Sequence, residues 1–171
     1  TAPYLRMQGA IFVRRGEKSI RSEADLAGKD VLVMRGDTAH EYAERKHLTD
    51  RLILTDSFEE AMRLLSQGKH DAVIVQQVAG LQIIRTLGIK NLVDVGTIRE
   101  ESLKVSRKPL SEFEQKFCFA VKKGDTALLA ALNEGLAVVF SNGVYEALYA
   151  KWFGPILPAP PMDVKAMLMV L

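Results

Sequence analysis

Several features are scarce in this sequence of 171 residues, and each scarcity excludes a class of protein. Because Cys118 is the single cysteine, no internal disulfide framework can form. The 23 basic residues are balanced by 21 acidic ones, and no basic stripe with interleaved aromatic residues occurs, so we expect no nucleic-acid partner. No apolar run reaches the roughly 18 residues that a membrane-spanning helix needs. The 48% of apolar and 26% of charged residues are ordinary for a globular domain.

Histidines are also few, and their spacing predicts no metal site. His40 and His47 are separated by about 10 Å if both lie on one helix, which is too far for a shared ion. His40 and Glu44 instead have the spacing of an i,i+4 surface pair. No local signature of a Ser-His-Asp or Cys-His arrangement occurs, so the sequence predicts no catalytic residues, and we expect no cofactor.

Short β-rich apolar runs alternate with helical periodicity, which favours an α/β protein with mainly parallel strands. The clearest helix begins after Ser57, which has capping-box spacing with Glu60, and ends at Gly68. The other expected helices are 38–46, 78–87, 125–140 and 144–152. The expected strands are 10–13, 31–34, 51–55, 71–75, 91–96 and 117–121.

Two side chains near the end of the chain are expected to be core residues. Cys118 lies in the apolar strand 117–121 and should be an inert buried thiol. Trp152 has helical spacing with Leu148 and Val144 and should plug a core. The proline-rich stretch GPILPAPPMD comes next and predicts a stiff linker, and the chain ends in the apolar tail VKAMLMVL, residues 164–171.

The stretch VLVMRGDTAHEYAER, residues 31–45, has the build of a strand, a glycine turn and a helix start. A helix N-terminus presents unpaired backbone N–H groups and about half a positive charge, so it is a natural site for an anion. Asp37 fits two roles here, because it can cap the helix that starts at Thr38 or face a ligand. The sequence leaves both roles open.

The order of these pieces resembles the periplasmic amino-acid-type solute-binding proteins of family 3, the two-lobed "Venus flytrap" modules. The resemblance rests on three segments in the family's order: DLAGKDVLVMRGDTAHEY, SFEEAMRLLSQGKHDAVIV and FCFAVKKGDTALLAALNEGLAVVFSNGVYEALYAKWFG. The third segment is especially similar to the versions of the module that serve as sensor domains of histidine kinases or cyclic-dinucleotide signalling proteins.

The resemblance implies a type II periplasmic-binding-protein-like α/β fold. Family members usually carry about 80 further residues before the point at which this chain begins. We therefore expect residues 25–110 to form a complete lobe 2, and residues 1–24 and 111–154 to supply hinge strands and a remnant of lobe 1. Residues 155–171 would be linker and tail. The apolar stripes of the last two helices would then need cover from a partner chain (a homodimer is one way), from the tail, or from an upstream segment.

The resemblance also implies which residues bind a ligand. Gly36, Asp37 and Thr38 stand where the family holds a ligand carboxylate, and Asp37 replaces a hydroxyl residue there with a negative charge. Gln76 stands where binders of α-amino acids have an aspartate for the ligand ammonium, and glutamine cannot neutralise a cation. Tyr4 stands near the hinge, where a side chain can lie against the ligand. Gln76 as a mere helix-start residue and Tyr4 as a packing residue remain alternatives. We expect a small polar ligand other than a standard amino acid.

By this resemblance the chain is a binding domain and not itself an enzyme. It would be the periplasmic sensor domain of an inner-membrane signal-transduction protein, above all a histidine kinase, in which a ligand closes two lobes about a hinge. A membrane tether would come after Leu171. A solute-binding receptor of an ABC transporter is the first alternative. An enzyme like the cyclohexadienyl dehydratases is the second, and Asp37 and Glu41 are the acids it would have.

Overall fold

The computed structural model describes residues 1–96, 110 and 112–156. They form two compact units, one of residues 8–114 and one that combines residues 1–7 with the described residues from Gln115 onward. Most of the predicted linker and the whole apolar tail lie outside the described residues. The assignment of residues 25–110 as lobe 2 stays a prediction.

A mixed sheet forms the centre of the larger unit, and its strand order is β3-β2-β4-β1-β5. β2 (Val31–Met34) pairs in parallel with β3 (Leu52–Thr55) and with β4 (Ala72–Gln76). β1 (Leu5–Arg14) is antiparallel to β4 and to β5 (Leu92–Asp94), and β6 (Glu114–Phe117) pairs with β1 off this path. The expected strands 31–34, 51–55 and 71–75 thus lie side by side in one sheet, with β2 in the middle.

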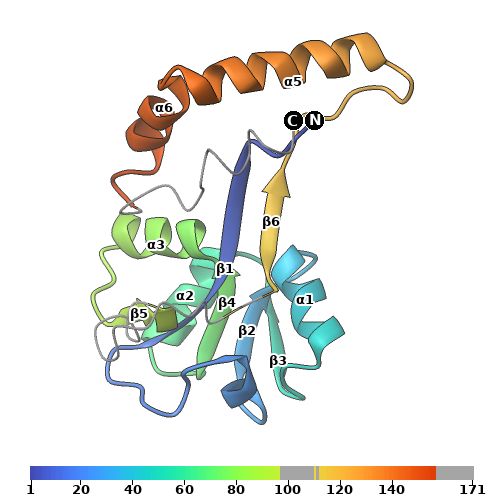
Figure 1. Ribbon diagram of the computed structural model, residues 1–171. Helices are drawn as coiled ribbons and strands as arrows, with labels where there is room; N and C mark the ends of the chain where they lie inside the picture. The colour runs from blue at the N-terminus through green and yellow to red at the C-terminus, as the bar shows by residue number, and fades with distance from the viewer. Residues whose placement is uncertain (97–109, 111, 157–171) are drawn as a thin grey trace. The chain divides into compact units, whose positions relative to one another are not determined.

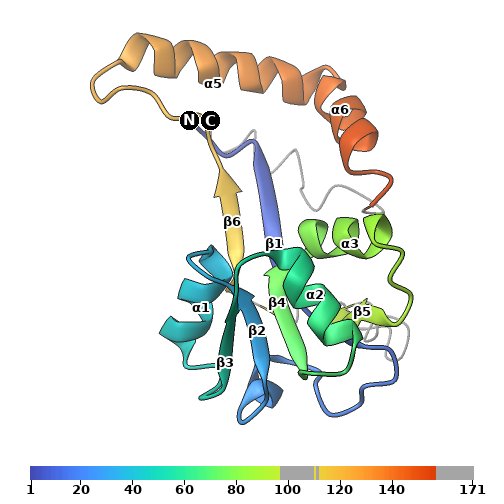
Figure 2. The same cartoon turned by 180° about the vertical axis from the view of Figure 1, so that it is seen from behind.

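Both faces of this sheet are covered by helices, because the largely buried central strands β2 and β4 carry apolar side chains on both faces. α1 (Thr38–Lys46) packs on one face, and α2 (Phe58–Ser66) and α3 (Gln77–Thr86) pack on the other (Figure 1, Figure 2). A short 3-10 helix, η1 (Glu23–Leu26), adds Leu26 to the α1 side. In β2 the alternation is plain: Val31 and Val33 belong to the α1 side, and Leu32 belongs to the other.

The helix α2 begins as the capping-box pattern predicts. The Ser57 hydroxyl accepts a hydrogen bond from the Glu60 amide at 3.1 Å, and the Glu60 carboxylate accepts one from the amide of Asp56 at 3.1 Å. Two donors at the helix start are thereby satisfied by side chains. Met62 and Leu65 on the apolar face of the helix are buried and pack it against the sheet.

In the smaller unit, the predicted strand 117–121 is wrong. β6 ends at Phe117, and Cys118 is exposed instead of buried. The physical reason lies in where the backbone groups of the next residues bond. The Phe119 carbonyl accepts from the chain's amino terminus at 3.0 Å, and the Phe119 amide donates to the Thr1 hydroxyl at 3.0 Å. Apolar residues alone predicted a strand here, but this segment bonds to the first residue and not to a sheet.

The prediction that Trp152 plugs a core is also wrong, since its side chain is 64% exposed. The helices α5 (Thr126–Ser141) and α6 (Val144–Trp152) bury a different stripe, which contains Phe140, Tyr145 and Tyr149. A helix with apolar residues on two sides does not indicate which side will be inside. Leu128, Val144 and Leu148 are therefore exposed as well. That a partner chain, the tail or an upstream segment covers these exposed residues stays a prediction.

Gly9 in β1 is a position where the fold leaves no room for a side chain. A Cβ atom there would lie 1.6 Å from Cδ1 of Phe113, whose ring is stacked on Tyr42 at a centroid distance of 4.9 Å. We predict that Gly9→Ala lowers the free energy of unfolding by about 1–3 kcal/mol, the usual cost of overpacking a dense core. Urea unfolding followed by circular dichroism measures the change.

Gly135→Ala in α5 is the matched control, because a Cβ atom at Gly135 would meet nothing within 4 Å. Alanine in a helix interior is favoured over glycine by about 1 kcal/mol, so this variant should be as stable as the parent or more stable. Equal unfolding midpoints for the Gly9→Ala variant and the parent would contradict the packing argument.

Candidate functional site

The candidate site begins where two neighbouring parallel strands end. α1 starts just after β2, and α3 starts just after β4, and these strands are hydrogen-bonded in parallel. The carboxyl ends of adjacent parallel strands share one edge of a sheet, where open α/β sheets place their ligand sites. The topology thus brings the turn Gly36–Thr38 and the residue Gln76 to the same edge. That they bind a ligand stays a prediction.

Gly36 makes the turn into α1 and has a φ of 72°, in the left-handed region that glycine tolerates. Asp37 then caps the helix: its carboxylate accepts from the amide of Ala39 at 3.2 Å. The hydroxyl of Thr38 also donates to this carboxylate, at 3.3 Å. The capping role of Asp37, one of the two left open by the sequence, is therefore present in the structure.

His40 makes a contact that the sequence did not reveal. Its Nδ1 accepts a hydrogen bond from the amide of Gly36 at 3.3 Å, while its Nε2 lies 3.1 Å from Oε1 of Glu44. The predicted pair of His40 and Glu44 is confirmed, but the histidine side chain is only 16% exposed and is held at both ring nitrogens. The spacing of Gly36 and His40, one helical turn, is the signal that could have indicated the contact.

Three further backbone amides at this helix start also donate within the protein. The Asp37 amide donates to the Met34 carbonyl at 3.2 Å, and the amides of His40 and Glu41 donate to the Asp37 carbonyl at 3.0 and 3.2 Å. Together with Gly36 and Ala39, five amides in this turn already have acceptors. An anion that bound to any of these five amides would have to displace its acceptor.

Gln76 closes β4 and stands at the N-cap of α3 without a side-chain capping bond. It is half-buried, and its Cα partner on the antiparallel neighbour β1 is Gly9. A glutamine side chain offers both a donor and an acceptor, so this position can hydrogen-bond a polar group but cannot balance its charge.

Tyr4 belongs to the smaller unit, and there its ring is stacked on Phe119 at a centroid distance of 4.6 Å. It lines an apolar groove of about 710 Å³ between the first residues of the chain and the two helices α5 and α6. Burial raises the pKa of Tyr145 to about 12 and raises that of Tyr149, so these phenols in the lining stay neutral at physiological pH. Packing, the alternative role of Tyr4, is what the structure shows for its ring.

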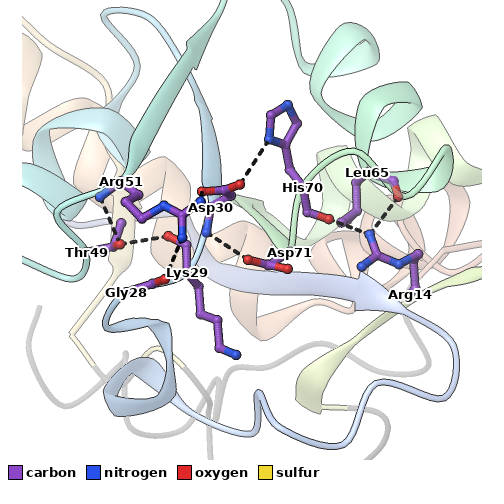
Figure 3. A network of polar contacts seen from close by, with 9 residues as sticks. All are labelled: Arg14, Gly28, Lys29, Asp30, Thr49, Arg51, Leu65, His70 and Asp71. Atoms are coloured by element: carbon purple, nitrogen blue, oxygen red, sulfur yellow. Dashed lines mark hydrogen bonds and ion pairs between the residues drawn. The ribbon is translucent and has the colours of Figure 1, made fainter.

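A second polar cluster lies at the amino ends of β2 and β4, away from this edge (Figure 3). The Asp71 carboxylate accepts from the Asp30 amide at 2.9 Å, and the Asp30 carboxylate forms an ion pair with Arg51 at 2.6 Å. Arg14 donates to the carbonyls of Leu65 and His70. These groups tie the starts of two strands to each other. Among the described residues, no group of three or more histidine, cysteine or acidic side chains could hold a metal ion.

None of the described helices is by itself long and apolar enough to cross a membrane. α5 and α6 meet the requirements of length and composition only as a pair, and the pair is bent by 80°. Part of its apolar surface is buried in the aromatic cluster of the smaller unit.

The capping bond of Asp37 gives a prediction about stability. Asp37→Ala leaves the Ala39 amide without its acceptor and should lower the free energy of unfolding by about 0.5–2 kcal/mol. Asp37→Ser keeps an acceptor at the cap and should retain most of that stability. Thermal unfolding of the three proteins at neutral pH measures both effects. Equal losses for the serine and alanine variants would show that the cap is not what stabilises this turn.

Comparisons with known proteins agree with this geometry. A profile of the bacterial extracellular solute-binding proteins, family 3, matches residues 1–155. The chain is 36% identical to a histidine kinase sensor domain with similarity to periplasmic binding proteins, whose crystal structure superposes with a TM-score of 0.68 over 90% of this chain and 62% of that one. It is 30% identical to the putative ABC transporter arginine-binding protein 2 of Escherichia coli, over 90% of this chain and 58% of the relative.

The virulence sensor protein BvgS of Bordetella pertussis is 26% identical over 89% of this chain, which corresponds to 11% of its own length. The chain spans about half the length of the curated binding proteins that it matches, from 49% to 58%.

Proposed function

The chain belongs to the bacterial extracellular solute-binding proteins, family 3, and from this premise we propose that it is the extracytoplasmic sensor domain of a membrane-bound histidine kinase. The observation that carries the proposal is the 36% identity to a histidine kinase sensor domain over 90% of this chain. The similarity to BvgS, a sensor protein many times longer than this chain, supports the same role. The output domain would lie elsewhere in the full-length protein, and this domain would be periplasmic and tethered to the inner membrane.

The connection between the two units suits a domain that reports on a ligand. The chain passes between them twice, at residues 7–8 and 114–115. A change in their relative orientation therefore requires new backbone torsions at two crossings only, which is typical of hinge motions. In this proposal a small polar molecule favours one orientation, and the shift in population is the signal.

A solute-binding receptor of an ABC transporter is the second candidate function, and the 30% identity to an arginine-binding protein favours it. The two roles differ in the segments that flank the domain in the full-length protein and in where that protein is found. A transport receptor is released from cells by osmotic shock, whereas a sensor stays in the inner membrane.

The full-length gene product separates these roles. We expect the protein in inner-membrane vesicles to incorporate phosphate from labelled ATP on a histidine, with the acid lability of a phosphoramidate. Recovery of the whole gene product in the osmotic-shock fluid, without such labelling, would exclude the sensor and favour the receptor.

The ligand is expected to be a small polar molecule other than a standard α-amino acid. By the family resemblance, a ligand carboxylate would bind at the turn where this chain has Asp37, and a ligand ammonium group would bind where it has Gln76, which carries no negative charge. Two like charges about 4 Å apart cost about 4 kcal/mol at an effective dielectric constant of 20, which is roughly a thousandfold in affinity.

Calorimetry with the twenty standard amino acids tests this expectation. None should bind the full-length domain with a dissociation constant in the micromolar range. The ABC transporter arginine-binding protein 1 of Escherichia coli, titrated with arginine, serves as the positive control. Micromolar binding of any zwitterionic amino acid would refute the expected ligand class while leaving the sensor role intact.

A further inference from the structure

We propose that Phe113 is a positioning residue that ties the two crossings of the chain to each other and to the larger unit, so that the two units reorient only when both crossings bend together. The inference rests on the proposed function in one respect, since it takes a change in the orientation of the two units as the signal. It goes further because it names the residue that fixes one end of the moving segment.

The surroundings of Phe113 are dense, although the residue precedes β6 and lies outside any helix or strand. It is 5% exposed and belongs to the core on the α1 side of the sheet. Its ring is stacked on Tyr42 of α1, with a centroid distance of 4.9 Å and an angle of 23° between the planes. The ring also fills the space above Gly9, where a Cβ atom would lie 1.6 Å from Cδ1. A helix and a strand of the larger unit therefore both hold this ring in place.

Tyr42 is itself fixed, so it supports the Phe113 ring in one position. It is 2% exposed, and its hydroxyl donates to Oε1 of Glu23 at 2.7 Å. Burial, and then the hydrogen bond to Glu23, raise the pKa of Tyr42, so the phenol keeps its proton at physiological pH. Glu112 adds an ion pair with Lys46 at the end of α1, but its side chain is 65% exposed. The exposed pair contributes little, and the stack of two rings is the main attachment.

Phe113 also joins the two crossings of the chain. Gly9 follows the crossing at residues 7–8, and Phe113 precedes the crossing at residues 114–115. The Gly9 amide donates to the Phe113 carbonyl at 2.8 Å, and the Tyr4 amide donates to the Phe117 carbonyl at 2.9 Å. One backbone hydrogen bond thus closes the pair of crossings on each side, and the strands β1 and β6 are paired. Because paired strands resist sliding past each other, the two crossings bend as one ribbon.

The ribbon formed by β1 and β6 continues into the sheet of the larger unit beside Gln76. Gly9 and Gln76 are Cα partners in the antiparallel pair of β1 and β4. A displacement of Gln76 would therefore reach Gly9 directly and, through the rings of Phe113 and Tyr42, also α1. These contacts form a contiguous network that joins the end of β4 to both crossings, whichever molecule binds at that edge of the sheet.

The test measures how widely the orientation of the two units varies. Spin labels are attached to Glu59→Cys in α2 and Glu134→Cys in α5, both exposed, in a Cys118→Ser background, because the native thiol is exposed too. Double electron–electron resonance then gives the distribution of distances between the labels. Phe113→Ala removes the ring that holds the crossings and should widen this distribution about twofold relative to the parent. Phe113→Leu keeps an apolar side chain without the stack and should widen it less.

Two matched variants separate this role from a general loss of stability. Met62→Ala removes a fully buried side chain of α2 from the opposite face of the sheet. It should lower the urea midpoint about as far as Phe113→Ala does, but without widening the distance distribution. Tyr42→Phe keeps the stacked ring, loses only the bond to Glu23, and should leave the width unchanged.

The inference is overturned if folded Phe113→Ala and Phe113→Leu variants give distributions as narrow as that of the parent. Equal widening by Met62→Ala would overturn it too, because Phe113 would then act through stability alone. Circular dichroism checks that each variant retains its fold, and Phe113→Leu carries the test if Phe113→Ala does not fold. Neither a ligand nor a kinase enters the measurement, so a negative phosphate-labelling result would reject the sensor role and leave this result interpretable.

Discussion

The parallel pairing of β2 with β4 is the interaction on which the rest of the larger unit depends. It aligns Val31 with Ala72 and Leu32 with Val73, so the two strands run in step and end at the same edge. The helices α1 and α3 start from that edge, and their packing on opposite faces buries all but the last residue of each strand. Because the cluster of Asp30, Asp71 and Arg51 fixes the other end of the same pair, a shift in register would break both its hydrogen bonds and the core.

Much of this architecture could be predicted from the sequence, since it depends on local signals. β2, α1 and α6 have the bounds that periodicity and the turn residues indicated, and the Ser57 cap is where its spacing placed it. The failures are of another kind. Apolar neighbours alone suggested a core position for Trp152 and Cys118, whereas burial depends on which face another element covers. In the larger unit, the helices and the strands that they cover all lie within the sequence and can be matched to each other. For the exposed apolar residues of α5 and α6, the sequence indicates an apolar surface but not the element that would cover it.

The candidate site was harder to predict from the sequence than the fold, for a physical reason. Gly36, Asp37 and Thr38 could be placed at a helix start, but the bonds of their polar atoms depend on rotamers and on competition between acceptors. Here an aspartate at the cap accepts from the Ala39 amide, and a histidine one turn later accepts from the Gly36 amide. Two helix starts with the same backbone geometry can therefore differ in whether they bind an anion. The difference depends on whether nearby side chains already accept hydrogen bonds from the first amides of the helix.

The larger unit is contiguous in sequence, and a backbone hydrogen bond of 2.8 Å joins the Gly9 amide near its start to the Phe113 carbonyl near its end. This arrangement has a consequence for synthesis on the ribosome. All strands of the sheet core are available once residue 114 has emerged, so this unit can fold while translation continues. Residues 1–7 have no such option, because Thr1, Ala2 and Tyr4 bond to residues of the smaller unit that are made more than a hundred codons later. Residues 1–7 are thus translated before the larger unit but acquire these contacts after it has been made.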